Sequence, residues 1–172
     1  MLIHPAGAAD RAEIELLLDA AFGTDRKSRT AYRLRAGLSP IPELSLVARD
    51  ADGRLVGSLQ SWPLCLASKS ANHGVTLVGP VAVAPQIQRS GLGKMLMAKT
   101  LSIADAGDHS ALLLIGDADY YGRFGFTAAP TAGWQVPGPV DPARLLARIA
   151  ADRILPVTGS LGPISNPDML AA

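Results

Sequence analysis

The stretch of sequence that most constrains the fold is Val78–Leu96, VGPVAVAPQIQRSGLGKML. Its run of Val and Ala closes at Ala84-Pro85 and predicts a buried strand, because β-branched residues suit a pleated sheet and proline cannot continue the hydrogen-bond ladder. From Gly91 onward, apolar residues recur at three- and four-residue steps, which predicts a helix that buries one face. A strand, a glycine turn and a helix N-terminus therefore follow one another directly.

The predicted helix N-terminus is suited to an anion. The first turn of a helix has backbone N–H groups without internal partners, and the helix dipole adds partial positive charge there. Gly91 and Gly93 lack the Cβ atoms that would hold a ligand away from the backbone, and Arg89 and Lys94 add full positive charges. A phosphate or pyrophosphate is the expected ligand, although two glycines can also serve only a tight turn.

Two common phosphate-binding motifs do not fit this spacing. A Walker loop needs a glycine where this chain has Gln88, and a Ser or Thr where Met95 follows Lys94. A dinucleotide-binding fingerprint needs a third Gly or Ala at the position of Leu96, with an acidic residue at a later strand end. We therefore expect neither ATP nor NAD to be the ligand.

The stretch resembles the acyl-CoA-binding motif of the GCN5-related N-acetyltransferases, in which a strand carrying Val-Ala-Val and a proline precedes Gln/Arg-x-x-Gly-x-Gly/Ala. Here the strand part is Val81-Ala82-Val83-Ala84-Pro85, and the turn is Gln88-Arg89-Ser90-Gly91-Leu92-Gly93. The family's second motif, a tyrosine, three residues and Gly-Phe, is matched by Tyr121, Gly125 and Phe126 within ALLLIGDADYYGRFGF. Together with the hairpin-like LSLVARDADGRLVGSLQSWPL, these motifs are closest to the YhbS-like branch of predicted acetyltransferases.

The resemblance implies an α/β (α+β) fold, with a mixed, mostly antiparallel central sheet that is splayed at the acyl-CoA cleft and flanked by helices. It covers residues 1–140, and we expect residues 141–172 to complete the same domain as a helix and an extended tail. The implied activity is transfer of an acetyl group from acetyl-CoA to a primary amine of a small molecule or a protein, by direct attack in a ternary complex. A non-catalytic acyl-CoA-binding or sensor module is the alternative.

The resemblance also implies which residues contact the co-substrate. Backbone groups around Val81, Ala82 and Val83 would pair with the pantetheine arm, with the N–H of Val83 donating to the thioester oxygen. Tyr121 would contact the cofactor and protonate the leaving thiolate, a role for which its neighbour Tyr120 is the competitor. Arg123 could reach a CoA phosphate or simply face solvent. The turn that would hold the pyrophosphate comprises Gln88, Arg89, Ser90, Gly91, Leu92, Gly93 and Lys94.

The sequence does not identify a general base. Some family members carry an acidic residue on the strand before the turn, whereas residues 75–83 contain no carboxylate. Glu43, His73 and Asp117 are candidates, each with a simpler explanation as a loop charge, a turn residue and a helix cap.

Composition limits the partners. A chain of 172 residues suits one domain, and a net charge of +1 provides no field for nucleic acid or an anionic membrane. No apolar run approaches the ~20 residues that span a bilayer, and no signal peptide is evident. The single cysteine, Cys65, suits a reducing compartment, so we expect a cytoplasmic protein, with a homodimer as a possible assembly. With His4 and His109 it shows no metal-ligand spacing, so we expect no metal.

Local patterns predict the remaining elements. Asp10 and Glu13 form a capping pattern before a helix that ends at Gly23, and the basic run 26–29 is expected on the solvent-facing side of a second helix over 26–36. We further expect strands at 44–49, 55–66, 75–83 and 111–115, helices at 91–106, 119–124 and 141–151, and an extended or disordered tail from Pro156.

Overall fold

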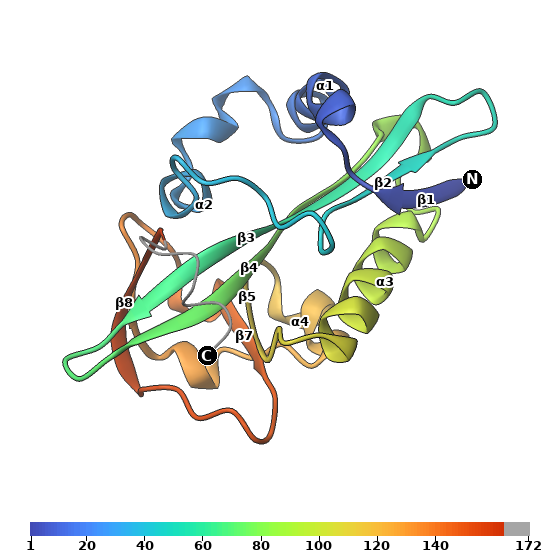
Figure 1. Ribbon diagram of the computed structural model, residues 1–172. Helices are drawn as coiled ribbons and strands as arrows, with labels where there is room; N and C mark the ends of the chain where they lie inside the picture. Colours follow the sequence, from blue (N-terminus) through green and yellow to red (C-terminus); the bar gives the residue numbers. More distant parts are fainter. Residues whose placement is uncertain (164–172) are drawn as a thin grey trace. The chain divides into compact units, whose positions relative to one another are not determined.

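The computed structural model describes residues 1–163 and contains a mixed sheet of eight strands flanked by helices (Figure 1). The strands follow the order β1-β2-β3-β4-β5-β7, and β8 pairs with both β3 and β6. The β4–β5 and β6–β8 pairs are parallel, whereas the β1–β2, β2–β3, β3–β8 and β5–β7 pairs are antiparallel. The predicted fold class, a mostly antiparallel mixed sheet with flanking helices, is confirmed.

The elements have the following bounds. The strands are β1 (Leu2–Pro5), β2 (Leu46–Arg49), β3 (Leu55–Ala67), β4 (Asn72–Val83), β5 (Ala111–Ile115), β6 (Gly133–Gln135), β7 (Leu145–Ile149) and β8 (Thr158–Pro163). The α-helices are α1 (Arg11–Phe22), α2 (Thr30–Leu34), α3 (Leu92–Ala106) and α4 (Ala118–Tyr121). Single 3-10 turns include η1 (Ala8–Asp10), η2 (Thr24–Ser28), η3 (Pro85–Ile87), η4 (Gly122–Phe124), η5 (Ala129–Thr131) and η6 (Pro142–Arg144).

The described residues divide into two compact units. The first consists of residues 1–27, 40–61 and 78–106, and the second of residues 28–39, 62–77 and the described part of the chain from 107 onward. Each of the strands β3 and β4 has one half in the first unit and its other half in the second. The expected division into a domain over 1–140 and a completing C-terminal segment stays a prediction.

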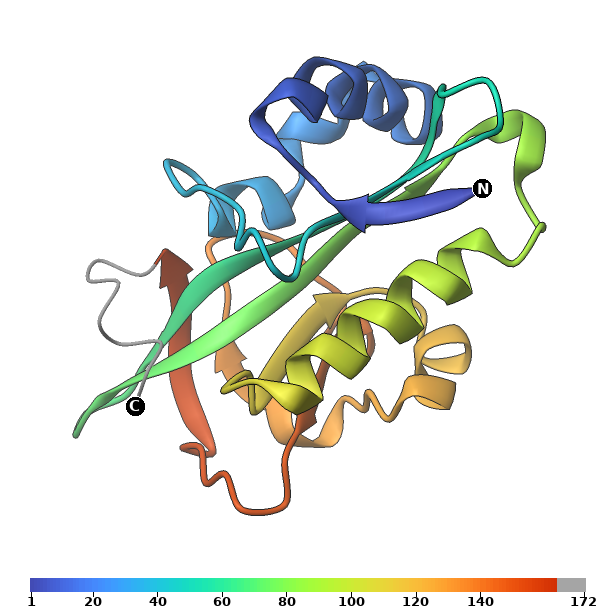
Figure 2. The same ribbon diagram turned by 45° about the vertical axis from the view of Figure 1, so that its right-hand side comes forward.

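In the first unit, α1 and α3 lie on opposite faces of β2, β3 and β4 (Figure 2). The apolar stripe of α1 packs against Val47 and Ala82 on one face. On the other face α3 approaches closely at Gly57, where a Cβ atom would come within 2.7 Å of Leu92 Cδ2. The buried side chains of α3 are those expected from its period, Leu96, Met97, Thr100, Leu101 and Ala104, preceded by Leu92.

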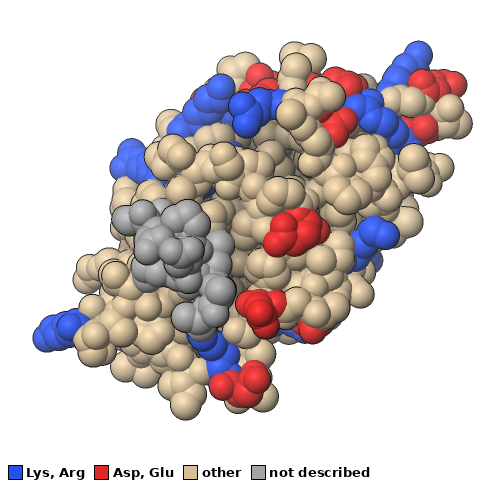
Figure 3. All heavy atoms as spheres, viewed as in Figure 1, with Lys and Arg blue, Asp and Glu red and all other residues tan. Residues whose placement is uncertain are grey.

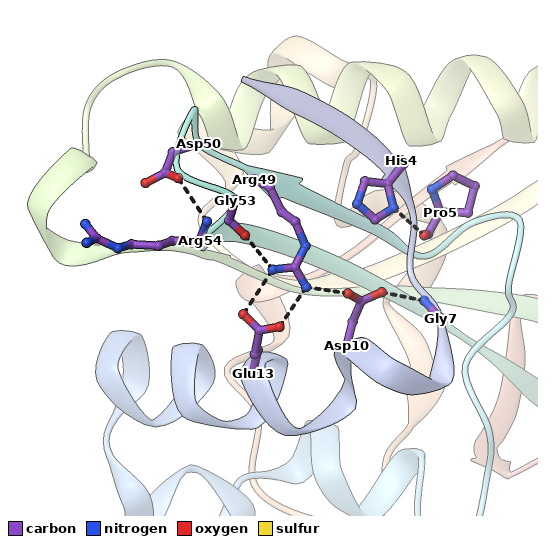
Figure 4. Close-up of polar contacts among 9 residues, drawn as sticks. All are labelled: His4, Pro5, Gly7, Asp10, Glu13, Arg49, Asp50, Gly53 and Arg54. Atoms are coloured by element: carbon purple, nitrogen blue, oxygen red, sulfur yellow. Dashed lines mark hydrogen bonds and ion pairs between the residues drawn. The ribbon is translucent and has the colours of Figure 1, made fainter.

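The start of α1 differs from the predicted capping box. The carboxylate of Asp10 accepts a hydrogen bond from the Gly7 N–H at 2.7 Å, and so closes η1 rather than the first turn of α1 (Figure 4). Arg49 of β2 then donates to Asp10 Oδ1 at 2.7 Å and to both carboxylate oxygens of Glu13, at 2.7 and 3.0 Å. Glu13 therefore accepts hydrogen bonds from the guanidinium of Arg49 on β2, rather than from a backbone N–H at the start of the helix.

Asp10 should make folding sensitive to acid. The Gly7 N–H lowers the pKa of Asp10 below 3.8, burial opposes this, and Arg49 adds to the lowering. A carboxylate whose pKa is depressed in the folded state stabilises it above the unfolded pKa, and this stabilisation is lost as pH falls through the folded pKa. Asp10→Asn should therefore cost about 1–2 kcal/mol of unfolding free energy at pH 7 and much less at pH 2.

Denaturant unfolding at both pH values measures this difference. Asp52→Asn is the matched control, because Asp52 is exposed and its contact with Arg54 is 3.9 Å long. Equal pH dependence in the Asp10 and Asp52 variants would contradict the assignment.

The basic run after α1 does not form the solvated helix face that was expected. The segment is broken into η2 and α2, and the side chain of Arg26 is only 1% exposed. Its guanidinium donates to Glu15 Oε2 at 2.6 Å and to Asp19 Oδ1 at 2.7 Å, both on α1. Two acidic residues one helical turn apart thus draw Arg26 inward, and a long side chain with paired charges can be buried at this point.

In the second unit, the expected helix over 141–151 is wrong. Asp141 caps only the turn η6, accepting a hydrogen bond from the Ala143 N–H at 2.9 Å, and the chain then continues as β7. β7 pairs with β5 along its full length, from Leu145 opposite Ile115 to Ile149 opposite Ala111. Leu145, Leu146 and Ala147 are consecutive and all buried, which a strand covered on both faces explains and a one-sided helix does not.

The C-terminal tail is extended in its described part, as predicted. β8 pairs in parallel with β6 and antiparallel with the end of β3. Trp134 of β6 is 7% exposed and donates its indole N–H to the Pro156 carbonyl at 2.9 Å. The remainder of the expected tail lies outside the described residues.

Charges of both signs are mixed on the surface. In Figure 3 basic and acidic side chains lie interspersed over α1 and the β2–β3 turn, and the visible face carries no broad area of one sign. Across residues 1–163, no helix combines the length and the apolar character needed to cross a bilayer.

Candidate active site

The site lies along the last residues of β4. The parallel ladder with β5 joins Thr76 to Leu112 and Leu77 to Leu113, and β4 continues to Val83. Gly79 follows with φ of 123°, a backbone conformation that side-chain-bearing residues rarely adopt, and Pro80 has no N–H to donate. The strand is therefore irregular at these two residues.

The end of β4 has a defined hydrogen-bonding direction. The N–H of Ala84 donates to the carbonyl of Val56 on β3, at 2.9 Å. Backbone groups of successive residues in a strand point to opposite edges, so the N–H groups of Val81 and Val83 point away from β3. Val81 and Val83 are half-buried, and Ala82 between them is buried. The edge expected to meet a pantetheine arm is therefore directed away from the neighbouring strand.

The turn after β4 is built from short-range hydrogen bonds. The Ser90 N–H donates to the Ile87 carbonyl at 3.2 Å, and the Ser90 hydroxyl accepts from the Leu92 N–H at 3.3 Å, which caps the start of α3. Arg89 and Gly91 have φ values of 69° and 87°, so the chain reverses through two left-handed residues. The φ of Gly91 lies in the left-handed region that favours glycine.

The resulting helix N-terminus is open to an anion. Among residues 1–163 no hydrogen-bond partner is found for the backbone N–H groups of Gly91, Gly93 and Lys94. A Cβ atom built at Gly91 would meet nothing within 4 Å, so the space above the turn is free. Gln88, Arg89 and Lys94 are exposed at its rim. These features fit a phosphate or pyrophosphate group: free donors, two cations and room for close approach.

The Tyr-x-x-x-Gly-Phe motif folds as a compact unit after β5. Asp117 caps α4 by accepting from the N–H groups of Asp119 and Tyr120, at 2.8 and 3.2 Å. Gly125 then turns the chain in the left-handed region with φ of 83°, which returns Phe126 to the core at 1% exposure. The spacing of the motif therefore follows from the structure: Tyr121 ends the single turn of α4, Gly125 reverses the chain, and Phe126 packs into the core.

The side chain of Tyr121 is half-buried. Its ring packs over the backbone of Gly116, where a Cβ atom would collide with it. Burial raises the pKa of Tyr121 to about 12, the neighbouring Tyr120 adds to the rise, and Arg144 opposes it. No hydrogen bond of this hydroxyl occurs among the described residues. Tyr121 therefore keeps its proton at neutral pH and can donate it in a hydrogen bond.

The neighbouring aromatic and basic residues are engaged with one another. The Tyr120 and Tyr121 rings meet edge to face with centroids 4.9 Å apart. Arg123 is exposed and lies over the Tyr120 ring at 5.0 Å, a cation–π contact. This contact leaves the guanidinium N–H groups of Arg123 at the surface, where a phosphate could be reached.

Candidate bases for the reaction remain scattered. Asp117 acts as the cap of α4, Glu43 is exposed and His73 is half-buried at the start of β4. Within the described part of the chain, no group of three or more His, Cys, Asp or Glu side chains is arranged to hold a metal ion.

The structure thus brings part of the predicted site together in one unit. Residues 81–83 and the turn 88–94 are contiguous in the first unit, and Tyr121 and Arg123 belong to the second. One polar residue of the first unit, Gln60 on β3, was not singled out from sequence, although an amide inside the apolar run LVGSLQSWPL is an unusual choice for a strand core.

Residues 3–129 match the model of the acetyltransferase (GNAT) domain. The chain belongs to the GNAT acetyltransferase family. Among curated proteins, the GNAT domain is similar to the uncharacterized N-acetyltransferase YhbS of Escherichia coli K12, with 27% identity over 160 residues, covering 92% of this chain and 93% of that protein. The predicted family and the YhbS-like branch are confirmed.

Solved structures support the same placement. The crystal structure of YhbS from Escherichia coli in complex with CoA superimposes with a TM-score of 0.75 at 25% identity, covering 95% of this chain and 89% of that one. A GNAT family acetyltransferase from Brucella melitensis in complex with acetyl-CoA gives a TM-score of 0.67 at 27% identity, with 95% and 96% covered. Both neighbours of this GNAT domain were thus crystallised with the coenzyme or its acetyl form.

Proposed function

We propose that this protein is an acyl-CoA-dependent N-acetyltransferase that moves an acetyl group from acetyl-CoA to a primary amine by direct attack in a ternary complex. The observation that carries the proposal is the end of β4, where the N–H groups of Val81 and Val83 point away from β3 and the strand runs into the open glycine turn. The CoA and acetyl-CoA complexes of the two similar proteins support the choice of co-substrate.

The turn and the strand edge bind the co-substrate in this proposal. The N–H groups of Gly91, Gly93 and Lys94 hold the pyrophosphate, and the side chains of Arg89 and Lys94 neutralise its charge. Residues 81–83 pair with the amide groups of the pantetheine arm as a further strand would. This pairing fixes the position of the thioester along β4.

The N–H of Val83 stabilises the charge that develops during transfer. It donates to the thioester oxygen, which becomes an oxyanion when the amine attacks and the carbon becomes tetrahedral. The new C–N bond forms, the C–S bond breaks, and the amine nitrogen loses one proton. Collapse of the intermediate then releases the CoA thiolate.

Tyr121 stabilises the leaving thiolate. A phenol with a pKa of about 12 is a weaker acid than a thiol with an ordinary pKa of about 8.5. Tyr121 therefore acts mainly by donating a hydrogen bond to the sulfur as charge builds there, and the final proton comes from solvent. The high pKa keeps this donor protonated across the whole physiological range.

Turnover with a panel of amines tests the function. Acetyl-CoA and the protein are incubated with spermidine, an Nα-blocked lysine and a short peptide with a free N-terminus, and free thiol is measured. We expect thiol release above the amine-free rate for at least one class. CoA binding by calorimetry without thiol release from any amine would instead favour the sensor module.

A further inference from the structure

A small polar pocket lies in the second unit, outside the residues proposed to bind acetyl-CoA. It is lined by residues 74–76 at the start of β4, by residues 108–111 before and at the start of β5, and by Arg153. All of these residues belong to the second unit. Because β4 and β5 run parallel, the pocket lies where both strands begin, whereas residues 81–83 come at the end of β4.

Backbone hydrogen bonds connect two sides of this pocket. The Ala150 N–H donates to the Ser110 carbonyl at 2.8 Å, and the Arg153 N–H donates to the Ala150 carbonyl at 3.0 Å. The turn that follows β7 is therefore joined directly to the residue before β5. The position of Arg153 beside the start of β5 thus follows from a strand end and a tight turn.

The side chains of the pocket offer hydrogen-bond donors. The guanidinium of Arg153 has N–H donors and no acceptor. Its Nε is buried and makes no hydrogen bond to residues 1–163, although the residue has other interactions. Thr76 is 2% exposed, and its hydroxyl lies 3.5 Å from His109 Nδ1, at the outer limit for a hydrogen bond. This hydroxyl can therefore donate to a better-placed acceptor.

The charges around the pocket favour an acceptor that is itself negatively charged. Arg153 is half-buried, whereas Asp108 is exposed, so solvent screens the acidic charge more than the basic one. A hydrogen bond from a guanidinium to an oxyanion is about twice as strong as one between neutral groups. The pocket is small and opens to solvent, so it suits the head of a small oxyanion.

We propose that this pocket binds a small oxyanion, a phosphate or a carboxylate group, through the Arg153 guanidinium and the Thr76 hydroxyl. Both ligand groups present several acceptor oxygens to the two donors, and the ring of His109 lies beside them. The inference goes beyond the proposed function and is independent of it, because none of the lining residues is proposed to bind acetyl-CoA.

Residue-resolved NMR of the isotopically labelled full chain tests the proposal, with inorganic phosphate and acetate as separate probes at constant ionic strength. CoA is present throughout, to occupy the glycine turn at 88–94. We expect amide shift changes at residues 74–76 and 109–111 that saturate with a Kd of about 1 mM. This affinity is what a few charge-assisted hydrogen bonds give to so small a ligand.

Four variants show which groups hold the anion. Arg153→Gln should weaken binding about tenfold, because a neutral amide replaces the charged donor. Arg54→Gln is the matched control, since Arg54 is an exposed arginine of the β2–β3 turn and should bind the probes as the parent does. Thr76→Val removes the hydroxyl from a side chain of similar shape and should weaken binding about threefold. Asp108→Asn should tighten binding about threefold, because it removes a negative charge at the pocket.

The outcomes separate the pocket from other anion sites. Saturable shifts in the pocket with either probe support the proposal, and the tighter probe identifies the preferred group. No saturable shift there with either probe, or equal affinities in Arg153→Gln and the parent, overturns it. Shift changes confined to residues 88–94 would assign the anion to the glycine turn and also overturn it. If Arg153→Gln does not fold, Thr76→Val and Asp108→Asn decide, since their expected effects have opposite signs.

Discussion

Tyr121→Phe is expected to lower the single-turnover rate of acetyl transfer about 100-fold while acetyl-CoA affinity stays unchanged. The substitution keeps the ring that packs over Gly116 and removes only the hydroxyl. General acid catalysis contributes about 10²–10⁴-fold, and the high pKa of this phenol places its contribution at the lower end, where a hydrogen bond to a charged group dominates. Single-turnover conditions are required because product release can limit steady-state rates.

Tyr120→Phe is the matched control. Tyr120 lies one residue away on α4 and its ring contacts both Tyr121 and Phe124, so it shares the environment without the proposed role. The control should transfer acetyl at nearly the parental rate. If Tyr120→Phe is the slow variant, the neighbouring tyrosine is the donor. Parental rates in both variants would mean that the thiolate leaves without help from a tyrosine.

Gly91→Val should weaken CoA binding at least tenfold. Valine at this position lowers affinity in two ways: its β-branched side chain occupies the space that the pyrophosphate needs, and its φ of 87° is unfavourable for any residue with a Cβ atom. Loss of one or two charge-assisted hydrogen bonds of about 1.5–3 kcal/mol each gives an effect of this size. Calorimetric titration with CoA measures it directly.

A control variant at a second glycine distinguishes loss of the ligand site from the effect of backbone strain. Gly53, in the β2–β3 turn, has φ of 81° and no atom near its potential Cβ, so Gly53→Val carries a similar conformational cost of about 1–2 kcal/mol. Gly53→Val should lower stability and leave CoA affinity intact. Equal CoA affinities in the two variants would contradict the assignment of the pyrophosphate to the turn at 91.

The strand, turn and helix of the first unit were predictable because each has a strong local signal. Pro85 ends one ladder, and the glycines and the period of α3 begin the next element, so residues 81–94 could be assigned from sequence. The left-handed conformation of Arg89 could not, because an arginine there has no local preference for positive φ. The positive φ of Arg89 arises because the chain must reverse within the short turn between β4 and α3.

The sequence-based predictions were wrong where contacts with residues distant in the sequence determine the local structure. Leu145 and Leu146 fit a helical period after Asp141-Pro142, yet the free edge of β5 converts them to a strand. Arg26 reads as a solvated cation until Glu15 and Asp19 are placed beside it.

The most direct test of the central claim is to follow an isotopically labelled acetyl group from acetyl-CoA, with and without a competent amine. Direct attack in a ternary complex predicts label on the amine in an amount equal to the thiol released, and an unmodified protein when the amine is omitted. Burial raises the pKa of the Cys65 thiol, which also disfavours a thioester on the protein. Label retained covalently on the protein before amine is added, or thiol released without acetylated amine, would contradict the account.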